Sequence, residues 1–260
     1  MGRSSLLSVS AVLALGAVLL ACGETAITIE TGGPPPPPPS VDLDEGLIAH
    51  WPFDEIEAGT TVVDASGHGH DGTPSPNPPQ PSLSVPPVGF SNARSLSFDG
   101  VEQLVDFGNP ARLDVSGNVT LSAWIRPAAL DGYRNVVAHG FRNMPSRELA
   151  LRVADSSLEF LAWNSVDHMA SAPVPAGDLD DWHHVAGVYD GRSYRLYRDG
   201  ELVAEHADDY APATVASPWA VGGRAETEPA EARYFSGCID DVRIYERALS
   251  PVEMRALFRR

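Results

Sequence analysis

From about residue 45 onward, short runs of apolar residues alternate with turn-forming residues along the chain. Runs of about four to eight residues rich in β-branched and aromatic side chains, bounded by Gly, Pro, Asn and Asp, are typical of β-strands. Such runs occupy residues 47–53, 94–98, 103–107, 119–126, 135–139, 148–153, 158–163, 182–189, 194–198, 201–205 and 235–245. The pattern predicts an all-β domain in which two antiparallel sheets pack on their apolar faces.

Two Asp-Gly pairs are the strongest hairpin signals in the chain. Asp190-Gly191 and Asp199-Gly200 each separate two of the apolar runs. Asp-Gly readily supplies the positive φ angles of a tight turn between antiparallel strands. We therefore expect a three-stranded meander over residues 182–205.

One helix is predicted, at the end of the chain. The sequence Ser250-Pro251-Val252-Glu253 is a capping box with proline at the first helical position, and apolar residues follow at 254, 257 and 258. Two stretches are predicted to be loops: 66–73, which is rich in glycine and histidine, and 74–87, which holds seven prolines. Neither is suited to a central strand.

The first 21 residues are typical of a signal peptide. Arg3 is followed by an uncharged apolar run over 6–20, which is shorter than the ~20 residues that a transmembrane helix needs. The sequence Leu19-Leu20-Ala21-Cys22 then resembles the lipobox of bacterial lipoproteins. That resemblance implies a diacylglycerol on Cys22 and a lipid-anchored protein of the cell envelope, at the outer membrane. The alternative is an ordinary signal peptide with an unrelated cysteine.

Residues 22–44 are predicted to be a tether between the anchor and the domain. Six consecutive prolines, Pro34–Pro39, favour an extended polyproline II spacer. The domain would then occupy residues 45–260, and the anchor would be its only contact with the membrane. If Cys22 is acylated, Cys238 is the single remaining thiol, so no internal disulfide is expected.

The charge of the chain argues against one class of partner. The formal net charge is −17, all 18 basic residues are arginine, and no basic run occurs. Binding to nucleic acid depends on a clustered positive surface that neutralises phosphates. A nucleic-acid partner is therefore not expected.

Six sequence blocks, in order, resemble laminin-G-like domains of the concanavalin A-like superfamily. They are residues 46–55, 64–72, 96–100, 121–125, 182–200 and 239–250, with Trp-His-His-Val-Ala-Gly-Val-Tyr-Asp-Gly at 182–191 and Ile-Asp-Asp-Val-Arg-Ile-Tyr at 239–245. The resemblance implies a two-sheet antiparallel jelly-roll sandwich with a short C-terminal helix. The proline-rich stretch 74–87 and Cys238 depart from the usual pattern. Relatives bind glycans, bind proteins, hold calcium or accompany an enzyme, so the function has to be argued from sites.

Four aspartates are candidate ligands for a structural calcium ion. Asp99, Asp240 and Asp241 lie in blocks where relatives often place such an ion, and Asp54 lies in the opening strand. Calcium takes about six to eight hard oxygen ligands. The alternative is that Asp99 forms a turn and that the other two pair with arginines such as Arg243.

A second metal site is a weaker candidate. His68, His70 and Asp71 lie together on a glycine-rich loop. No third histidine is near in the sequence, and Asp and Gly are common in tight loops. We do not expect zinc there.

The known catalytic patterns of this fold are absent from the sequence. Laminarinase-like hydrolases carry Glu-x-Asp-x-x-Glu on one strand, and the alginate lyases need a tyrosine–lysine motif; the chain has neither the first pattern nor any lysine. No Gly-x-Ser-x-Gly motif occurs either. We therefore expect a binding protein and not an enzyme.

Aromatic side chains are the candidate glycan-binding residues. Trp124, Trp163 with Asn164, and Trp219 could stack on sugar rings, although packing in the core or at loop edges is the favoured interpretation for each tryptophan. The favoured interpretation is a surface-displayed binding or adhesion module for a glycan or a protein. The alternatives are a structural envelope lipoprotein with a protein partner and no small ligand, and, third, a polysaccharide hydrolase or lyase.

Overall fold

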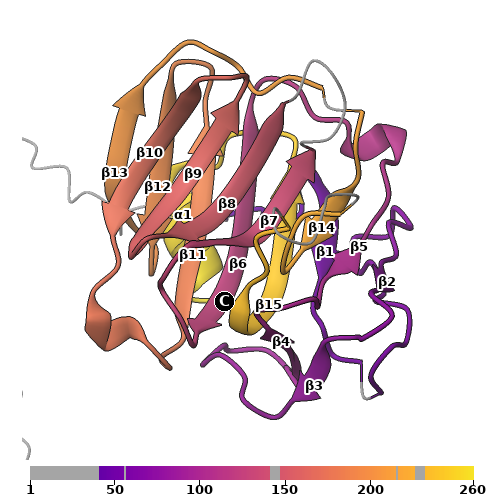
Figure 1. The fold of residues 1–260 in the computed structure, drawn as a ribbon. Coiled ribbons are helices and arrows are strands. Elements are labelled where there is room, and N and C mark those ends of the chain that lie inside the picture. The colour runs from indigo at the N-terminus through magenta and orange to yellow at the C-terminus, as the bar shows by residue number, and fades with distance from the viewer. Residues whose placement is uncertain (1–40, 56, 141–146, 215, 226–231) are drawn as a thin grey trace, which may run out of the picture. The chain divides into compact units, whose positions relative to one another are not determined.

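Two antiparallel β-sheets packed face to face make up the domain (Figure 1). In this computed structural model, the residues described are 41–55, 57–140, 147–214, 216–225 and 232–260. The order of the first sheet is β13-β12-β11-β6-β15-β4-β3, with β1 also pairing with β15, and that of the second is β10-β9-β8-β7-β14-β5-β2. The predicted all-β sandwich with a C-terminal helix is confirmed.

The strands of the first sheet are β1 (Leu47–Trp51), β3 (Gln80–Ser82), β4 (Ser95–Asp99), β6 (Val119–Pro127), β11 (His183–Tyr189), β12 (Ser193–Arg198), β13 (Glu201–Ala207) and β15 (Ser236–Tyr245). Those of the second are β2 (Thr73–Pro74), β5 (Val105–Asp106), β7 (Tyr133–Gly140), β8 (Glu148–Ala154), β9 (Ser157–Trp163), β10 (Asp167–Pro173) and β14 (Trp219–Val221). Two short 3-10 helices, Ala111–Leu113 and Ala176–Asp178, and α1 (Pro251–Phe258) complete the described elements.

Four strands were not predicted: β2, β3, β10 and β14. The first three lie at the ends of the two sheets, and each of them contains a proline, at position 74, 81 or 173. An edge strand tolerates proline because its outward N–H is not needed for pairing. The stretch 74–87 is therefore not entirely loop, although it contributes no central strand.

The predicted meander is confirmed in β11, β12 and β13, which pair antiparallel in succession. At its second turn, Asp199 and Gly200 both have positive φ, 51° and 77°. At the first turn only Gly191 does, and the Asp190 carboxylate instead accepts hydrogen bonds from the backbone N–H groups of Arg192 and Ser193. Both turns thus use the local chemistry for which Asp-Gly is suited.

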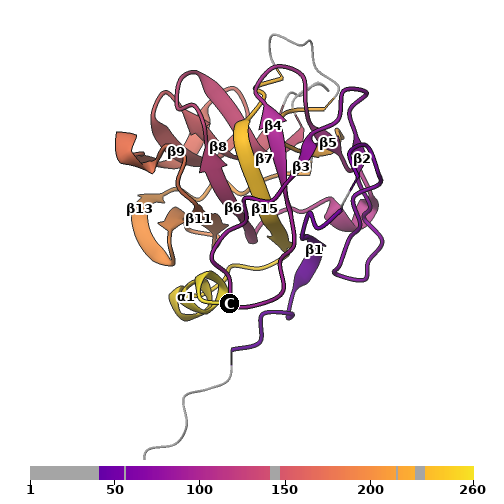
Figure 2. The same ribbon diagram turned by 90° about the horizontal axis from the view of Figure 1, so that it is seen from below.

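The apolar core lies between the sheets, and at Gly187 the backbone of β11 approaches β9 closely. A Cβ added there would lie 2.1 Å from the ring of Phe160 on β9, so only glycine fits. The predicted capping box of α1 is present, because Ser250 and Glu253 each accept the other's backbone N–H. Figure 2 shows α1 on the outer side of the first sheet, where Met254 and Leu257 pack against it.

Described residues just before position 45 also contact the sandwich. Arg247 donates hydrogen bonds to the backbone carbonyls of Asp42 and Glu45. The predicted signal peptide, Cys22 and the proline run Pro34–Pro39 lie outside the described residues. Within the described part of the chain, no helix has the length and apolarity to cross a membrane.

Candidate functional site

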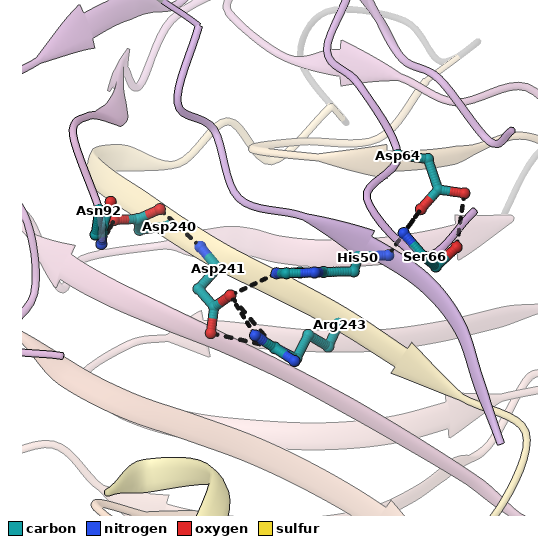
Figure 3. A network of polar contacts seen from close by, with 7 residues as sticks. All are labelled: His50, Asp64, Ser66, Asn92, Asp240, Asp241 and Arg243. Atoms are coloured by element: carbon teal, nitrogen blue, oxygen red, sulfur yellow. Dashed lines mark hydrogen bonds and ion pairs between the residues drawn. The ribbon is translucent and has the colours of Figure 1, made fainter. Parts of the chain in front are cut away.

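The carboxylate of Asp241 is engaged by the side chains of His50 and Arg243 and is not free to coordinate a metal ion (Figure 3). Its carboxylate oxygen Oδ1 lies 2.6 Å from His50 Nε2 and accepts a hydrogen bond from Arg243 Nη2 at 2.9 Å. Burial acts to raise the pKa of Asp241, but the His50 hydrogen bond and the Arg243 charge outweigh it and hold this pKa well below the usual range. Asp241 therefore already has its counter-charges.

Asp99 lies apart from the other aspartates. It is exposed at the end of β4, where its Oδ1 accepts hydrogen bonds from the backbone N–H groups of Val101, Glu102 and Gln103. Its partner on β15 is Ser236, four residues before Asp240. The predicted set of four aspartates is therefore not brought together, and Asp99 serves the turn that follows it.

Asp240 and Asp54 both contact the segment that contains Asn92, so their carboxylates lie near each other. Asn92 Nδ2 donates to Asp240 at 2.8 Å, and the Asp54 carboxylate accepts the backbone N–H groups of Ala93 and Arg94. Burial raises the pKa of Asp240 to about 8, although the Asn92 hydrogen bond opposes this rise. The charges of Asp241 and Asp54 also favour the neutral form.

A hard cation would find oxygen atoms at this point. Asn92 Oδ1 is buried and has no hydrogen-bond partner among the described residues, and Asp240 and Asp54 supply carboxylates beside it. These three residues fit the oxygen-donor chemistry of calcium. Across the described ranges, however, no group of three or more His, Cys, Asp or Glu side chains is arranged for a metal.

The histidine loop is organised by Asp64, which the sequence analysis overlooked. Asp64 accepts the backbone N–H groups of His50, Ser66 and His70 and the hydroxyl of Ser66. The Asp71 carboxylate in turn accepts the backbone N–H of Asp64. The acidic groups of the loop are thus used to hold its conformation, and no metal-binding group that includes His68, His70 and Asp71 is found among the described residues.

Two of the predicted sugar-binding tryptophans are buried. Trp124 is 2% exposed beneath α1, with its ring 5.6 Å from that of Phe258, and Trp219 is 0% exposed and stacks on His139 at 4.3 Å. Trp124 does lie on the outer face of β6, but α1 covers that face. Because a sugar needs an accessible ring face, neither tryptophan presents a stacking surface in this structure.

Trp163 and Asn164 lie at the partly exposed end of β9. Trp163 faces outward from the second sheet, directly opposite Glu148 on β8, and packs against Ala138, Ala150 and Leu161. Asn164 Oδ1 accepts the backbone N–H of Val166. Of the predicted ligand-binding residues, these two lie nearest to solvent.

A buried ion cluster on the same face was not predicted. We define the Glu148 cluster as Glu148, Arg152, Glu159, Arg224 and Arg233. Glu148 accepts a hydrogen bond from Arg224 Nε at 2.6 Å and lies 3.5 Å from Arg233 Nη1, while Arg152 donates to Glu159 at 2.7 Å. Burial, together with the charges of Arg224 and Arg152, lowers the pKa of Arg233 to about 10. The negative charge of Glu148 acts in the opposite direction but does not outweigh them. No local pattern could reveal this cluster, because Glu148 and Arg224 are 76 residues apart.

A cavity of about 600 Å³ lies at the β2–β5 end of the second sheet. We call it the Tyr234 cavity; its lining includes Pro74, Pro76, Glu102, Leu104, Asp106 and Tyr234. Burial raises the pKa of the Tyr234 hydroxyl, and the carboxylate of Glu102 adds to the rise, so an acidic group lies close to this ring. Glu102 also accepts a hydrogen bond from Asn77. An aromatic ring, proline and leucine side chains and two carboxylates therefore surround one open space.

Comparisons with known proteins agree with this architecture. The family model described as concanavalin A-like lectin/glucanases superfamily matches residues 99–255, which is more than half of the chain. No curated protein matches the sequence. Domain 4 of an extracellular arabinanase from Geobacillus stearothermophilus, solved in complex with arabinotriose, is similar with a TM-score of 0.56 and 18% identity, over 82% of this chain and 98% of that one.

Two toxin structures are similar over part of their length. The binding domain of Paraclostridial Mosquitocidal Protein 1 has a TM-score of 0.63 and 15% identity, over 84% of this chain and 52% of that one. The ligand-binding domain of botulinum neurotoxin serotype D, solved with N-acetylneuraminic acid, has a TM-score of 0.59 and 12% identity, over 83% and 51%. The chain thus spans about half the length of each toxin structure, and the likeness is one of fold.

Proposed function

This chain belongs to the concanavalin A-like lectin/glucanases superfamily, and we propose that its domain binds glycans in the Tyr234 cavity. The observation that carries the proposal is the composition of that cavity, in which an aromatic ring lies beside the carboxylates of Glu102 and Asp106. An aromatic ring packs against the apolar face of a sugar, and carboxylates accept hydrogen bonds from its hydroxyl groups. Cavities of about 300–1,000 Å³ are the usual size for small ligands.

The similar structures support a glycan as the ligand class. The arabinanase domain was solved with arabinotriose and is matched over nearly its whole length. The toxin domain was solved with N-acetylneuraminic acid, but the matched half need not be the part that binds it. Within the superfamily, function follows the site and not the fold, so the test has to address the cavity itself.

Tyr234→Ala is expected to weaken glycan binding about tenfold, which corresponds to ~1.4 kcal/mol of lost stacking. The purified protein is first screened on a glycan array, and the affinity of wild type and variant for the best glycan is then measured by calorimetry. Tyr133→Ala is the matched control, because Tyr133 is 48% exposed and lies outside the cavity. It should leave the affinity unchanged.

Three outcomes would contradict the proposal. An equal affinity in Tyr234→Ala would place binding elsewhere, and no retention on any glycan would favour the structural envelope protein with a protein partner. Release of reducing ends from a glycan, abolished in Glu102→Gln, would identify a hydrolase. That last result would overturn our proposal that the domain binds without catalysis.

We further propose that the domain is held at the cell envelope, at the outer membrane, by a lipid on Cys22. The lipobox-like sequence that precedes Cys22 supports this. Cys22→Ser should move the protein from the membrane fraction to the soluble fraction and abolish incorporation of labelled palmitate. Cys238→Ser is the matched control, because Cys238 is buried in β15 and should not affect fractionation. Membrane retention of a palmitate-labelled Cys22→Ser variant would rule out the anchor.

Calcium is a second proposed ligand, with a structural role. The residues that would hold it are Asp54, Asn92 and Asp240, and the buried, unpaired Oδ1 of Asn92 supports the assignment. Asp99 and Asp241 are not included, because their carboxylates serve a turn and an ion pair.

A further inference from the structure

The Tyr234 cavity carries negative charge that its own lining does not neutralise. Among the described residues, the lining includes Glu102 and Asp106 but no arginine or histidine. Neither carboxylate forms an ion pair with a described residue. Glu102 Oε1 accepts a hydrogen bond from the side chain of Asn77 at 2.8 Å, and Asp106 Oδ1 accepts one from the backbone N–H of Gly108 at 2.7 Å. These uncharged donors orient the carboxylates and leave their charges in place.

The arginines that adjoin the lining are engaged elsewhere. Arg134 donates to the backbone carbonyl of Tyr234, but its Nη2 lies 2.8 Å from the carboxylate of Asp131. Arg224 and Arg233, on either side of the segment in the sequence, belong to the Glu148 cluster. None of the three lines the cavity, so the two carboxylates are available to a cation from a ligand.

The aromatic ring lies in the same negative environment. Burial, and after it the charges of Glu102 and Asp99, raises the pKa of the Tyr234 hydroxyl above its ordinary value. An ammonium group is attracted both by carboxylates and by the face of an aromatic ring. A ligand carboxylate would instead be repelled by the charges around this ring.

Paired segments hold the two carboxylates in position. Asp106 lies on β5, which pairs with β2, and beyond β2 the backbone N–H of Ser75 donates to the carbonyl of Leu104 at 2.9 Å. The Ser75 hydroxyl in turn accepts the backbone N–H of Leu104 at 3.2 Å. The hydrogen bond from Asn77 to Glu102 joins the same two segments. The negative charges are thus preorganised, which reduces the entropic cost of binding a ligand between them.

We propose that the ligand of the Tyr234 cavity is a glycan with free amino groups, such as a chain of glucosamine units, whose ammonium group pairs with Glu102 and Asp106. This inference rests on the proposed glycan site and narrows its substrate class. The ring of any sugar can pack against Tyr234, whereas the ammonium group is what distinguishes this ligand. Acidic glycans are disfavoured by the same two charges.

The test is a calorimetric titration of the full-length protein with the trimers of glucosamine, N-acetylglucosamine and galacturonate. It is done at low ionic strength and about pH 6, where an aliphatic amine is protonated. The first two trimers share a backbone and differ in the charge on nitrogen. The glucosamine trimer is expected to bind about fivefold more tightly than the acetylated trimer, and the galacturonate trimer more weakly than either. Added salt should reduce the difference, because it screens exposed charges.

Glu102→Gln should lower the ratio of the glucosamine and N-acetylglucosamine affinities severalfold, because it removes a charge and keeps the shape of the side chain. Asp167→Asn is the matched control. Asp167 is exposed on β10, at the opposite edge of the second sheet from β2, and its substitution removes the same charge from the protein. The ratio should be unchanged in this variant.

The failure of this inference and the failure of the proposed glycan site give different results. Equal affinities for the glucosamine and acetylated trimers, tighter binding of galacturonate, or a ratio indifferent to Glu102→Gln would overturn the inference. The glycan site would still stand if Tyr234→Ala weakened the binding that remained. Binding of no glycan, or binding that Tyr234→Ala leaves intact, would overturn both.

Discussion

Replacing Glu148 by glutamine is expected to lower the free energy of unfolding by about 3–5 kcal/mol. Glu148 is 3% exposed, and Arg152, Arg224 and Arg233 all lie within ion-pair distance of its carboxylate. Without its negative charge, these buried guanidinium groups would lack their shared partner. The measurement is urea denaturation of wild type and variant, followed by fluorescence.

Glu159→Gln is the matched control for this prediction. Glu159 also lies on the outer face of the second sheet, but among the described residues it forms an ion pair with Arg152 alone, and it is somewhat closer to solvent. A loss of about 1–2 kcal/mol is expected, in the range of one hydrogen bond to a charged group. If Glu148→Gln costs no more than Glu159→Gln, the contacts of Arg224 and Arg233 with Glu148 add no more stability than a single ion pair.

Asp240→Asn is expected to raise the free energy of unfolding by roughly 2–5 kcal/mol at about pH 9 when no divalent ion is present. Burial raises the pKa of Asp240 to about 8 in the folded protein, against ~3.9 in an unfolded chain. The folded state therefore binds this proton more tightly. The resulting stabilisation is complete below about pH 4 and is lost as the pH rises through about 8. Asparagine removes the charge that causes this loss.

Bound calcium would reverse the sign of the effect of Asp240→Asn on the free energy of unfolding. If the ion binds Asp54, Asn92 and Asp240, it stabilises the folded state by mass action, by ~2.7 kcal/mol at 100 times its dissociation constant. Chelation should then lower the melting temperature of the wild type by several degrees, and Asp240→Asn should abolish that response. Asp99→Asn is the control, because Asp99 lies away from this group and should leave the calcium response intact. A wild type that is indifferent to chelator would eliminate the calcium site.

Features determined by neighbouring residues could be derived from the sequence alone. The Asp199-Gly200 turn, the capping box at Ser250 and the alternation that places Leu121 inside and Trp124 outside each depend on a few consecutive residues. Backbone conformation and strand alternation act at this range, so the fold class followed from the pattern. The six ordered blocks supplied the sheet arrangement through the family resemblance.

The candidate sites depended on contacts that the sequence does not contain. Alternation identified the outer face that carries Trp124, but only the docking of α1 decided that this face is covered. The adjacent Asp240 and Asp241 belong to different environments because β15 has a bulge there, with Asp241 at φ 44°.

The Glu148 cluster shows the same limit most directly. It joins β8 to arginines 76 and 85 residues away, and the Tyr234 cavity likewise combines segments that only the folded chain brings together. Local chemistry therefore determined the turns, the helix and most of the strands, whereas β2, β3, β10 and β14 were seen only in the structure. Tertiary packing alone decided which side chains are buried, which are paired and which face an open cavity, because each of these depends on partners distant in the chain.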